Sequence, residues 1–212
     1  MARRNTRELV LLTSLALFNK LGEANVSTNL IANEAEISPG NLYYHFRSKE
    51  DIVLELFKRY LLVIRPLVSI DEAEQPGIDD LWMRLHLIFE AMGRFRFLFR
   101  NLPDLYARLP NLRHALHGLL ERQRNSLERL ISGLEARGVM SIENHAIPML
   151  VDNMLLNMTY WIPYAEIHGQ AGLEDATSIT SAAARVLHLI LPHMRGEEAQ
   201  ALRHLAMQYQ QA

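Results

Sequence analysis

The spacing of apolar residues at the start of the chain predicts a helix. Leu9, Leu12 and Leu15 recur at helical intervals, and Gly22 follows as a stop signal. We therefore expect a first helix over residues 6–21.

Two short helices and one long helix are expected next. Ser27 or Thr28 is placed to cap the second helix, and Ser38 followed by Pro39 is typical of the start of a third. The two short helices would meet across a tight turn. From Ser48 a long apolar face continues to about Pro66, which predicts a fourth helix that acts as a connector.

Helical periodicity continues to the end of the chain, with no convincing alternation of the kind that marks a strand. Residues 69–77, SIDEAEQPG, are the best linker because they are acidic and end in Pro and Gly. Further helices are expected over residues 78–93, 95–102, 111–137, 141–168, 173–194 and 197–210. The prediction is an all-α chain with a head at 1–50, a connector at 51–68 and a larger domain at 78–212.

Composition narrows the classes of protein that remain. Of the 212 residues 49% are hydrophobic and 22% charged, as in globular proteins. Cysteine is absent, which excludes disulfides, thiolate metal sites and a cysteine nucleophile. A net charge of -2 excludes a uniformly basic coat for nucleic acid but allows a local footprint. With no signal peptide or membrane span recognisable, we expect a cytoplasmic protein without membrane association.

Residues 26–53, VSTNLIANEAEISPGNLYYHFRSKEDIV, contain the most informative motif. This stretch resembles the DNA-binding domain of the TetR family of transcription regulators. The resemblance implies a three-helix helix-turn-helix domain joined by a connector helix to a larger helical bundle that binds an effector and dimerises. It also implies double-stranded DNA, a small-molecule effector and a second copy of the chain as partners, with no cofactor and no enzymatic activity.

The third helix is the expected reader of the DNA major groove. Small or polar residues at its first turn would let the backbone approach DNA closely, and the following aromatic residues would reach phosphates. Glu36 departs from the family pattern, because glycine is common at this point of the turn. The expected DNA-binding residues are Thr28, Ser38, Pro39, Gly40, Asn41, Tyr43, Tyr44, His45 and Lys49.

Several of these residues also have a purely structural interpretation. Tyr43 could equally be a packing residue, and Asn41 could satisfy only local backbone groups. Leu42 and Phe46 are spaced to face the core of the head. The N-terminal arginines Arg3, Arg4 and Arg7 would either be solvated or contact DNA.

An effector pocket is expected in the larger domain. Asparagine and tyrosine on an otherwise apolar helix face are expected where a cavity is lined, although the same residues could fill a core with satisfied hydrogen bonds. The implied ligand is mostly apolar. The candidate lining residues are Trp82, His86, Phe89, Phe99, Tyr106, Met149, Asn153, Asn157 and Tyr160.

A dimer interface is expected on the last two long helices, as family members pair through two such helices. Ligand entry would shift the helix at residues 82–89 against the connector and separate the two reading heads. The residues expected at the interface are Met154, Met158, Trp161, Ala182, Ala183, Val186, Leu187, Ile190 and Leu191.

Three other interpretations remain open at this stage. His114 and His117 are spaced as metal ligands, but no carboxylate accompanies them. LFNKLGEANVST, ISPGNLYYHF and FRFLFRNLPDLYARLP are similar to regulators of polyhydroxyalkanoate storage genes, which implies an acyl-type effector. The alternative function is a helical protein-interaction module without DNA binding. DNA binding is expected to repress transcription, and activation of transcription remains an alternative.

Overall fold

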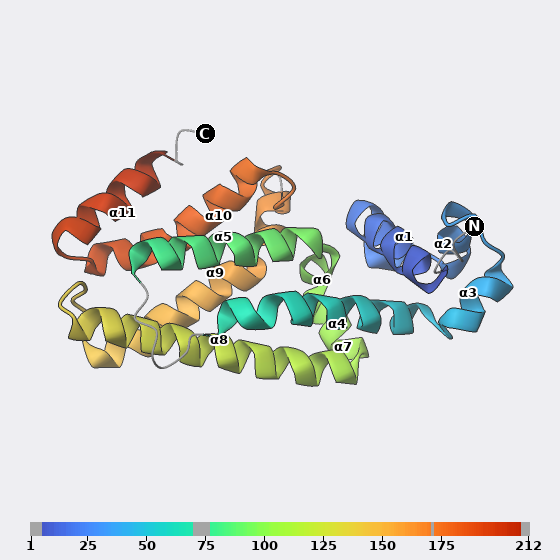
Figure 1. Ribbon diagram of the computed structural model, residues 1–212, viewed down its shortest axis with the longest axis horizontal. Helices are drawn as coiled ribbons and strands as arrows, with labels where there is room; N and C mark the ends of the chain where they lie inside the picture. The colour runs from blue at the N-terminus through green and yellow to red at the C-terminus, as the bar shows by residue number, and fades with distance from the viewer. Residues whose placement is uncertain (1–5, 70–76, 171, 209–212) are drawn as a thin grey trace. The chain divides into compact units, whose positions relative to one another are not determined.

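The computed structural model describes residues 6–69, 77–170 and 172–208, and among these residues it contains helices and no strand (Figure 1). The all-α class is confirmed. The helices are α1 (Thr6–Leu21), α2 (Thr28–Glu34), α3 (Pro39–His45), α4 (Lys49–Val68), α5 (Ile78–Arg94), α6 (Phe97–Arg100), α7 (Leu102–Arg108), α8 (Pro110–Ala136), α9 (Ile147–Ile167), α10 (Ala176–Ile190) and α11 (Gly196–Gln208). Short 3-10 turns occupy Glu23–Asn25, Asn144–Ala146 and Leu191–His193. None of the described helices is long and apolar enough to cross a bilayer.

The contacts divide the described chain into two compact units. The first contains residues up to 62 together with 95–115, and the second contains 63–94 and the residues from 116 onward. The first unit is therefore discontinuous in sequence, since α6, α7 and the start of α8 join α1–α3 and most of α4. This division falls at other points than the boundary expected at 69–77, most of which lies outside the described residues.

The first unit is organised around α1, which packs against both α2 and α3 (Figure 1). The apolar residues that close this core are spaced along each helix so that one face is buried, as helical periodicity requires. Its fully or almost fully buried side chains include Val10, Leu11, Phe18, Ile31, Leu42 and Phe46.

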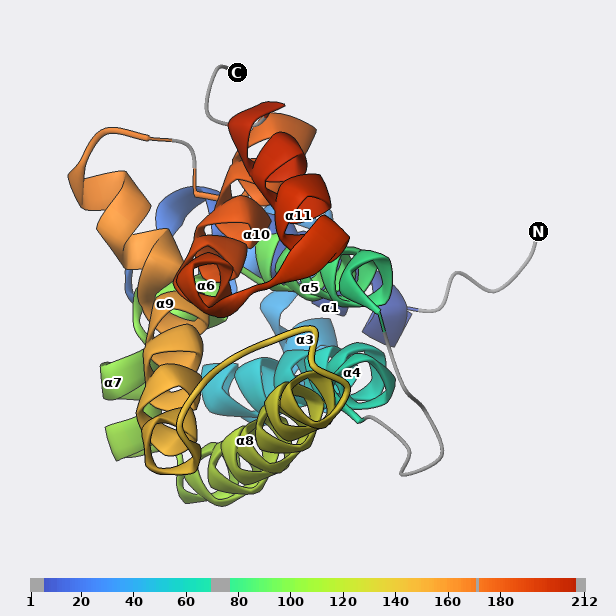
Figure 2. The same ribbon diagram turned by 90° about the vertical axis from the view of Figure 1, so that its left-hand side faces the viewer.

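In the second unit α10 lies beside α5 and α9, and it also packs against α11 (Figures 1 and 2). Gly93 of α5 is required by this packing. An ideal Cβ at Gly93 would stand 2.4 Å from the carbonyl oxygen of Leu173, which precedes α10 and has a φ of 61°. The absence of a side chain thus lets the backbone of the α9–α10 connection touch α5.

Several expected element bounds are wrong: the helix expected over 141–168 begins at Ile147, and the one expected over 173–194 spans Ala176–Ile190. The connector helix continues through Pro66 to Val68, the residue at which the connector was expected to end. The single helix expected over 95–102 is split at Asn101, whose φ of -123° and ψ of 30° are not helical. Pro103 then lies in the first turn of α7, where the missing N–H has no helical partner to lose.

Candidate nucleic-acid interface

The N-terminal turn of α3 is capped and open to solvent. Ser38 has extended backbone angles, and its Oγ accepts a hydrogen bond from the Asn41 N–H at 3.2 Å. Pro39 occupies the first turn. Ser38, Pro39, Gly40 and Asn41 are all exposed, so the turn presents small and polar groups to an approaching molecule.

The turn from α2 to α3 is held by backbone bonds around a left-handed residue. The N–H of Ile37 donates to the Ala32 carbonyl at 3.0 Å, and the N–H of Glu36 donates to Asn33 at 3.1 Å. Glu36 has a φ of 53°, a region that favours glycine. The departure noted in the sequence is therefore a real strain at this turn.

The aromatic residues of α3 divide between core and surface. Leu42 and Phe46 are buried, as expected, while 83% of Tyr44 and 48% of Tyr43 are exposed. The Tyr43 hydroxyl lies 2.8 Å from Oγ1 of Thr28, so this pair links α2 to α3.

Tyr44 and His45 form an edge-to-face ring pair with centroids 5.0 Å apart. His45 is half-buried, whereas Tyr44 projects into solvent. The pair presents a hydroxyl and an imidazole side by side at the end of α3. Both groups can donate hydrogen bonds to phosphate oxygens.

The Lys49 side chain is largely buried in the first unit, where it pairs with Glu23. Its ammonium lies 3.0 Å from Oε1 of Glu23 and donates to the Glu23 carbonyl at 2.9 Å. Only 1% of the Glu23 side chain is exposed, and its other carboxylate oxygen accepts from Arg108 at 2.8 Å. A buried carboxylate of this kind needs cationic partners, and two of them surround it here. Lys49 thus supports the end of α3 from within.

Sequence reasoning missed Glu23 and Arg108 as parts of this support. They are 85 residues apart, and neither spacing nor composition connects them. Arg108 also pairs with Asp104 at 2.8 Å, and Asp104 together with Glu23 raises the pKa of the guanidinium. A charged residue in the short turn after α1 was the one available signal.

The remaining cations near α1 are engaged or exposed. Arg7 lies over the Phe46 ring and pairs with Glu55 at 3.1 Å, and Arg47 is exposed. Arg59 donates to both carboxylate oxygens of Glu8, which lowers the pKa of that carboxyl. Arg3 and Arg4 lie outside the described residues.

The nine residues expected to line an effector pocket are not brought into one site. Phe99 and Tyr106 belong to the unit that contains α3. Phe89 is fully buried, and Trp82 pairs with His86 at a centroid distance of 6.2 Å. Periodicity placed these residues on helix faces, but it could not show which faces meet. Three of the nine, Asn153, Asn157 and Tyr160, line a common groove.

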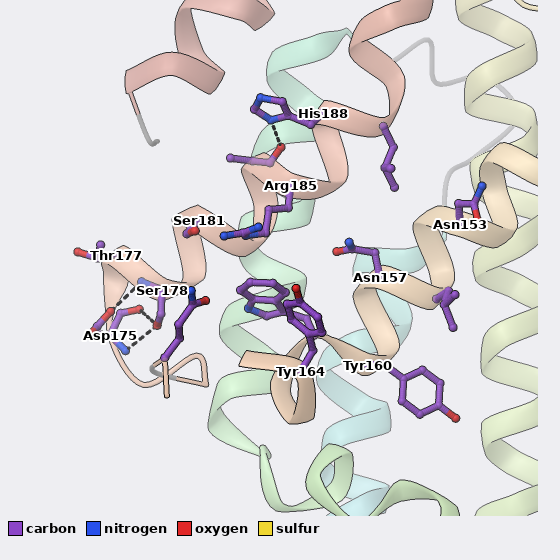
Figure 3. Close-up of a pocket in the computed structure, with 15 residues that line it drawn as sticks. Asn153, Asn157, Tyr160, Tyr164, Asp175, Thr177, Ser178, Ser181, Arg185 and His188 are labelled. Atoms are coloured by element: carbon purple, nitrogen blue, oxygen red, sulfur yellow. Dashed lines mark hydrogen bonds between the residues drawn. The ribbon is translucent and has the colours of Figure 1, made fainter. Parts of the chain in front are cut away.

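This groove runs between α9 and α10 and has a volume of about 1040 Å³ (Figure 3). Asn157 and Tyr164 stand on its α9 side, and Ser181 and Arg185 on its α10 side, while Tyr160 points away from α10 (Figure 3). The Arg185 guanidinium lies over the Trp161 ring at 4.6 Å. The groove is partly open to solvent.

A second, smaller pocket lies elsewhere in the second unit, among residues of α4, α5, α8 and α9. Its volume is about 30 Å³, and it is walled by apolar side chains such as Leu85 and Met158. Gln123 and Ser126, which also line it, are the two buried polar residues of this unit among those described. The space would hold about one water molecule.

Most residues expected at the dimer interface lie on the buried faces of α9 and α10. Met154, Met158 and Trp161 are buried within their own unit, as are most of the α10 residues expected at the interface: Ala182, Ala183, Val186, Leu187 and Ile190. Leu191 is half-buried. The exposed apolar face of α9 is instead formed by Met149, Leu156, Tyr160, Tyr164 and Ile167. Because both faces of α9 are apolar, periodicity alone could not tell which of them faces the core.

His114 and His117 are both exposed on α8. Across the described residues no group of three or more metal-ligating side chains comes together. The histidine pair therefore has no third ligand within the part of the chain that the structure describes.

Comparison with known proteins agrees with this geometry. Residues 10–56 match the family model described as bacterial regulatory proteins, tetR family, and residues 59–202 match the TetR model of a bacterial transcriptional repressor. The chain is 40% identical over 87 residues to the HTH-type transcriptional regulator YerO of Bacillus subtilis (strain 168), which covers 40% of this chain and 30% of that protein.

Solved structures extend the likeness to the whole fold. A TetR-family transcriptional regulator from Marinobacter aquaeolei VT8 is 30% identical, with a TM-score of 0.87 over 97% of this chain and 98% of that one. A transcriptional regulator from Saccharomonospora viridis, solved in complex with choline, has the same fold at 21% identity, with a TM-score of 0.64 over 87% and 94% of the two chains. The chain belongs to the TetR family and is a DNA-binding transcription regulator of the repressor type.

Proposed function

We propose that the protein is a dimeric repressor that reads a palindromic operator with α3 and is released by a small, mostly apolar effector. The observation that carries the DNA-reading part is Gly40. A Cβ there would meet no atom within 4 Å, so packing within the described chain does not require glycine. Glycine in a helix costs about 1 kcal/mol relative to alanine. Close approach of α3 to DNA accounts for that cost.

The side chains around Gly40 supply the contacts. Tyr44 and His45 donate to phosphates, and Asn41 faces the bases from the first turn of the helix. Tyr43 is oriented by its hydrogen bond with Thr28, and the exposed part of its ring contacts the DNA. Lys49 is committed to Glu23, so the phosphate contact expected from the sequence is not part of this proposal.

A second copy of the chain covers the exposed apolar face of α9. Leu156, Tyr160, Tyr164 and Ile167 follow one another at intervals of four, four and three residues, which places them on one stripe of the helix. Such a stripe is typical of helix-to-helix association. A two-fold dimer gives two recognition helices, and these read two half-sites of a palindrome.

The effector site that we propose is the smaller pocket lined by Leu85, Met158, Gln123 and Ser126. Its apolar walls suit an apolar ligand, including one with an acyl chain, and the buried amide and hydroxyl suit one polar group on it. At about 30 Å³ the cavity must widen to admit such a ligand. We propose that this widening is the structural change that weakens operator binding. The protein would act in the cytoplasm, where the chromosome lies.

The function is tested by selecting bound sequences from a random duplex library. Wild-type protein is expected to enrich a palindrome, and the Tyr44→Ala, His45→Ala double variant to bind it at least about tenfold more weakly, because contacts of this kind contribute about 1–3 kcal/mol each. Fluorescence anisotropy with the enriched duplex measures the loss.

The matched control is Leu12→Ala, which trims a half-exposed side chain on α1 of the same unit. It should retain the wild-type affinity. If folded wild-type protein enriches no sequence, the DNA-reading function is wrong and a helical interaction module becomes the better account. If the double variant binds as tightly as wild type, α3 is not the reader.

A further inference from the structure

The groove between α9 and α10 has no part in the function proposed above. Every residue that lines it belongs to the second unit, so its geometry does not depend on the first. Its volume of about 1040 Å³ is close to the upper end of the range for sites that bind small molecules, about 300–1,000 Å³. The groove therefore has room for an organic ligand as well as for water.

Arg185 supplies a cation on the α10 side of the groove. Its guanidinium lies over the Trp161 ring at 4.6 Å, so the side chain is supported by the indole. Within the described part of the chain no carboxylate is paired with Arg185. A guanidinium held in this way offers a fork of N–H donors whose geometry matches a carboxylate.

Two buried polar atoms on the α9 side of the groove have no hydrogen-bond partner among the described residues. They are Oδ1 of Asn157 and Nε1 of Trp161, a residue of which only 5% is exposed. Buried polar groups in native proteins are normally paired, so two orphans beside one groove point to a partner that is not part of the chain. Figure 3 shows Asn157 facing Arg185 across the groove.

We infer that the groove binds a small organic carboxylate with a flat, apolar body. The carboxylate lies between Arg185 and Asn157 and accepts hydrogen bonds from the guanidinium. The Asn157 amide can turn its NH2 toward the anion, and the indole N–H of Trp161 is a third donor. One ligand thus gives a partner to all three groups. The site is separate from the effector site proposed above, with which it shares no lining residue among those described.

The rest of the groove limits the ligand to one anionic group. Its flat body packs against the half-exposed Tyr164, whose ring is 5.7 Å from that of Trp161. At the start of α10 the groove is lined by Asp175, where hydrogen bonds from Ser178 lower the pKa of the carboxyl. At 1.5 Å per residue, Asp175 is about 15 Å from Arg185 along the helix. A ligand carboxylate is therefore attracted to one end of the groove and repelled from the other.

The test uses benzoate, benzamide and acetate as probes, without DNA. The chain has two tryptophans, so Trp82→Phe leaves Trp161 as the single reporter beside Arg185. Benzoate should change the Trp161 emission saturably. It should bind at least about fivefold more tightly than benzamide, which lacks the charge, and than acetate, which lacks the ring.

The substituted proteins are compared in the Trp82→Phe background. Arg185→Gln should reduce the preference for benzoate over benzamide to less than about twofold, because the neutral amide no longer favours the anion. Arg129→Gln is the matched control. It changes an exposed arginine of α8 that does not line the groove, so the preference should stay as it was.

Asn157→Leu separates a binding role from a structural one. It should weaken benzoate binding about threefold and raise the midpoint of thermal unfolding, because it removes a buried oxygen that has no partner in the unliganded protein. An amide with a purely structural role would instead lower the midpoint and leave benzoate binding unchanged, which would contradict the proposal.

Three other results would also overturn it. The first is an unchanged Trp161 emission at saturating probe concentrations, and the second is equal binding of benzoate and benzamide. The third is equal weakening in Arg185→Gln and Arg129→Gln, since benzoate would then bind by charge at no particular place.

Discussion

Glu36 stands at the tightest point of the helix-turn-helix, with a φ of 53° and an exposed side chain. A left-handed conformation costs a residue with a Cβ roughly 1–2 kcal/mol, because Cβ approaches the following carbonyl oxygen. Glutamate occupies this position in spite of that cost. The turn is therefore held by its surroundings, in particular by the buried Ile31 and Leu42 on either side.

Replacing Glu36 by glycine should stabilise the protein by about 1 kcal/mol, since glycine adopts this conformation without strain. Chemical denaturation measures the gain. Glu34→Gly is the matched control: it lies in α2, two residues earlier, and should lose about 0.5–1 kcal/mol because its backbone is helical. A loss of stability at both positions would mean that the turn is not strained.

At this scale the sequence predicted the local structure of α3 but not the residues that support it. The capping role of Ser38 and the burial of Leu42 follow from residue type and helical spacing. The pairing of Glu23 with Arg108 does not, because it depends on how two distant segments fold onto each other. Apart from the charge of Glu23 in the short turn after α1, the sequence contains no signal for such a pair.

Among the elements, α5 shows how a single glycine adapts a helix to its neighbour. Gly93→Ala should destabilise the protein by about 1–3 kcal/mol, because the new methyl group would stand 2.4 Å from the Leu173 carbonyl oxygen and force the connection away. Gly118 in α8 has open space around the same position, so Gly118→Ala should stabilise by up to about 1 kcal/mol. Thermal unfolding of the two variants should shift in opposite directions, and a shift of the same sign in both would contradict the packing described for Gly93.

Apolar periodicity predicted the positions of most helices to within a few residues. It could not predict which face of each helix is buried. In α9 the buried Met154 and Met158 alternate with the exposed Leu156 and Tyr160, so both sides look like a core in the sequence. Which side is buried depends on where α10 and α5 lie, and this information is not local. For that reason the residues expected at the dimer interface on α9 are buried, while Met149, Asn153 and Tyr160, expected in the pocket, are exposed.

At the scale of the whole molecule, the proposed dimer depends on the exposed apolar face of α9. Leu156→Asp should yield a folded monomer, because a carboxylate at the centre of an apolar interface would be buried without a partner. Light scattering at micromolar concentration reports the mass, and circular dichroism reports folding. Met83→Asp, at an exposed position of α5, is the control and should remain dimeric. A dimer that survives Leu156→Asp would place the interface elsewhere.

The discontinuous first unit has a consequence for exchanging parts between regulators. A chimera joined at one point after α4 would combine α1–α4 of one protein with α6 and α7 of another. Asn19 and Glu23 would then face foreign partners in place of Phe97, Arg100 and Arg108. A hybrid repressor that is to recognise the operator of one parent therefore needs both the α1–α4 region and residues 95–115 from that parent.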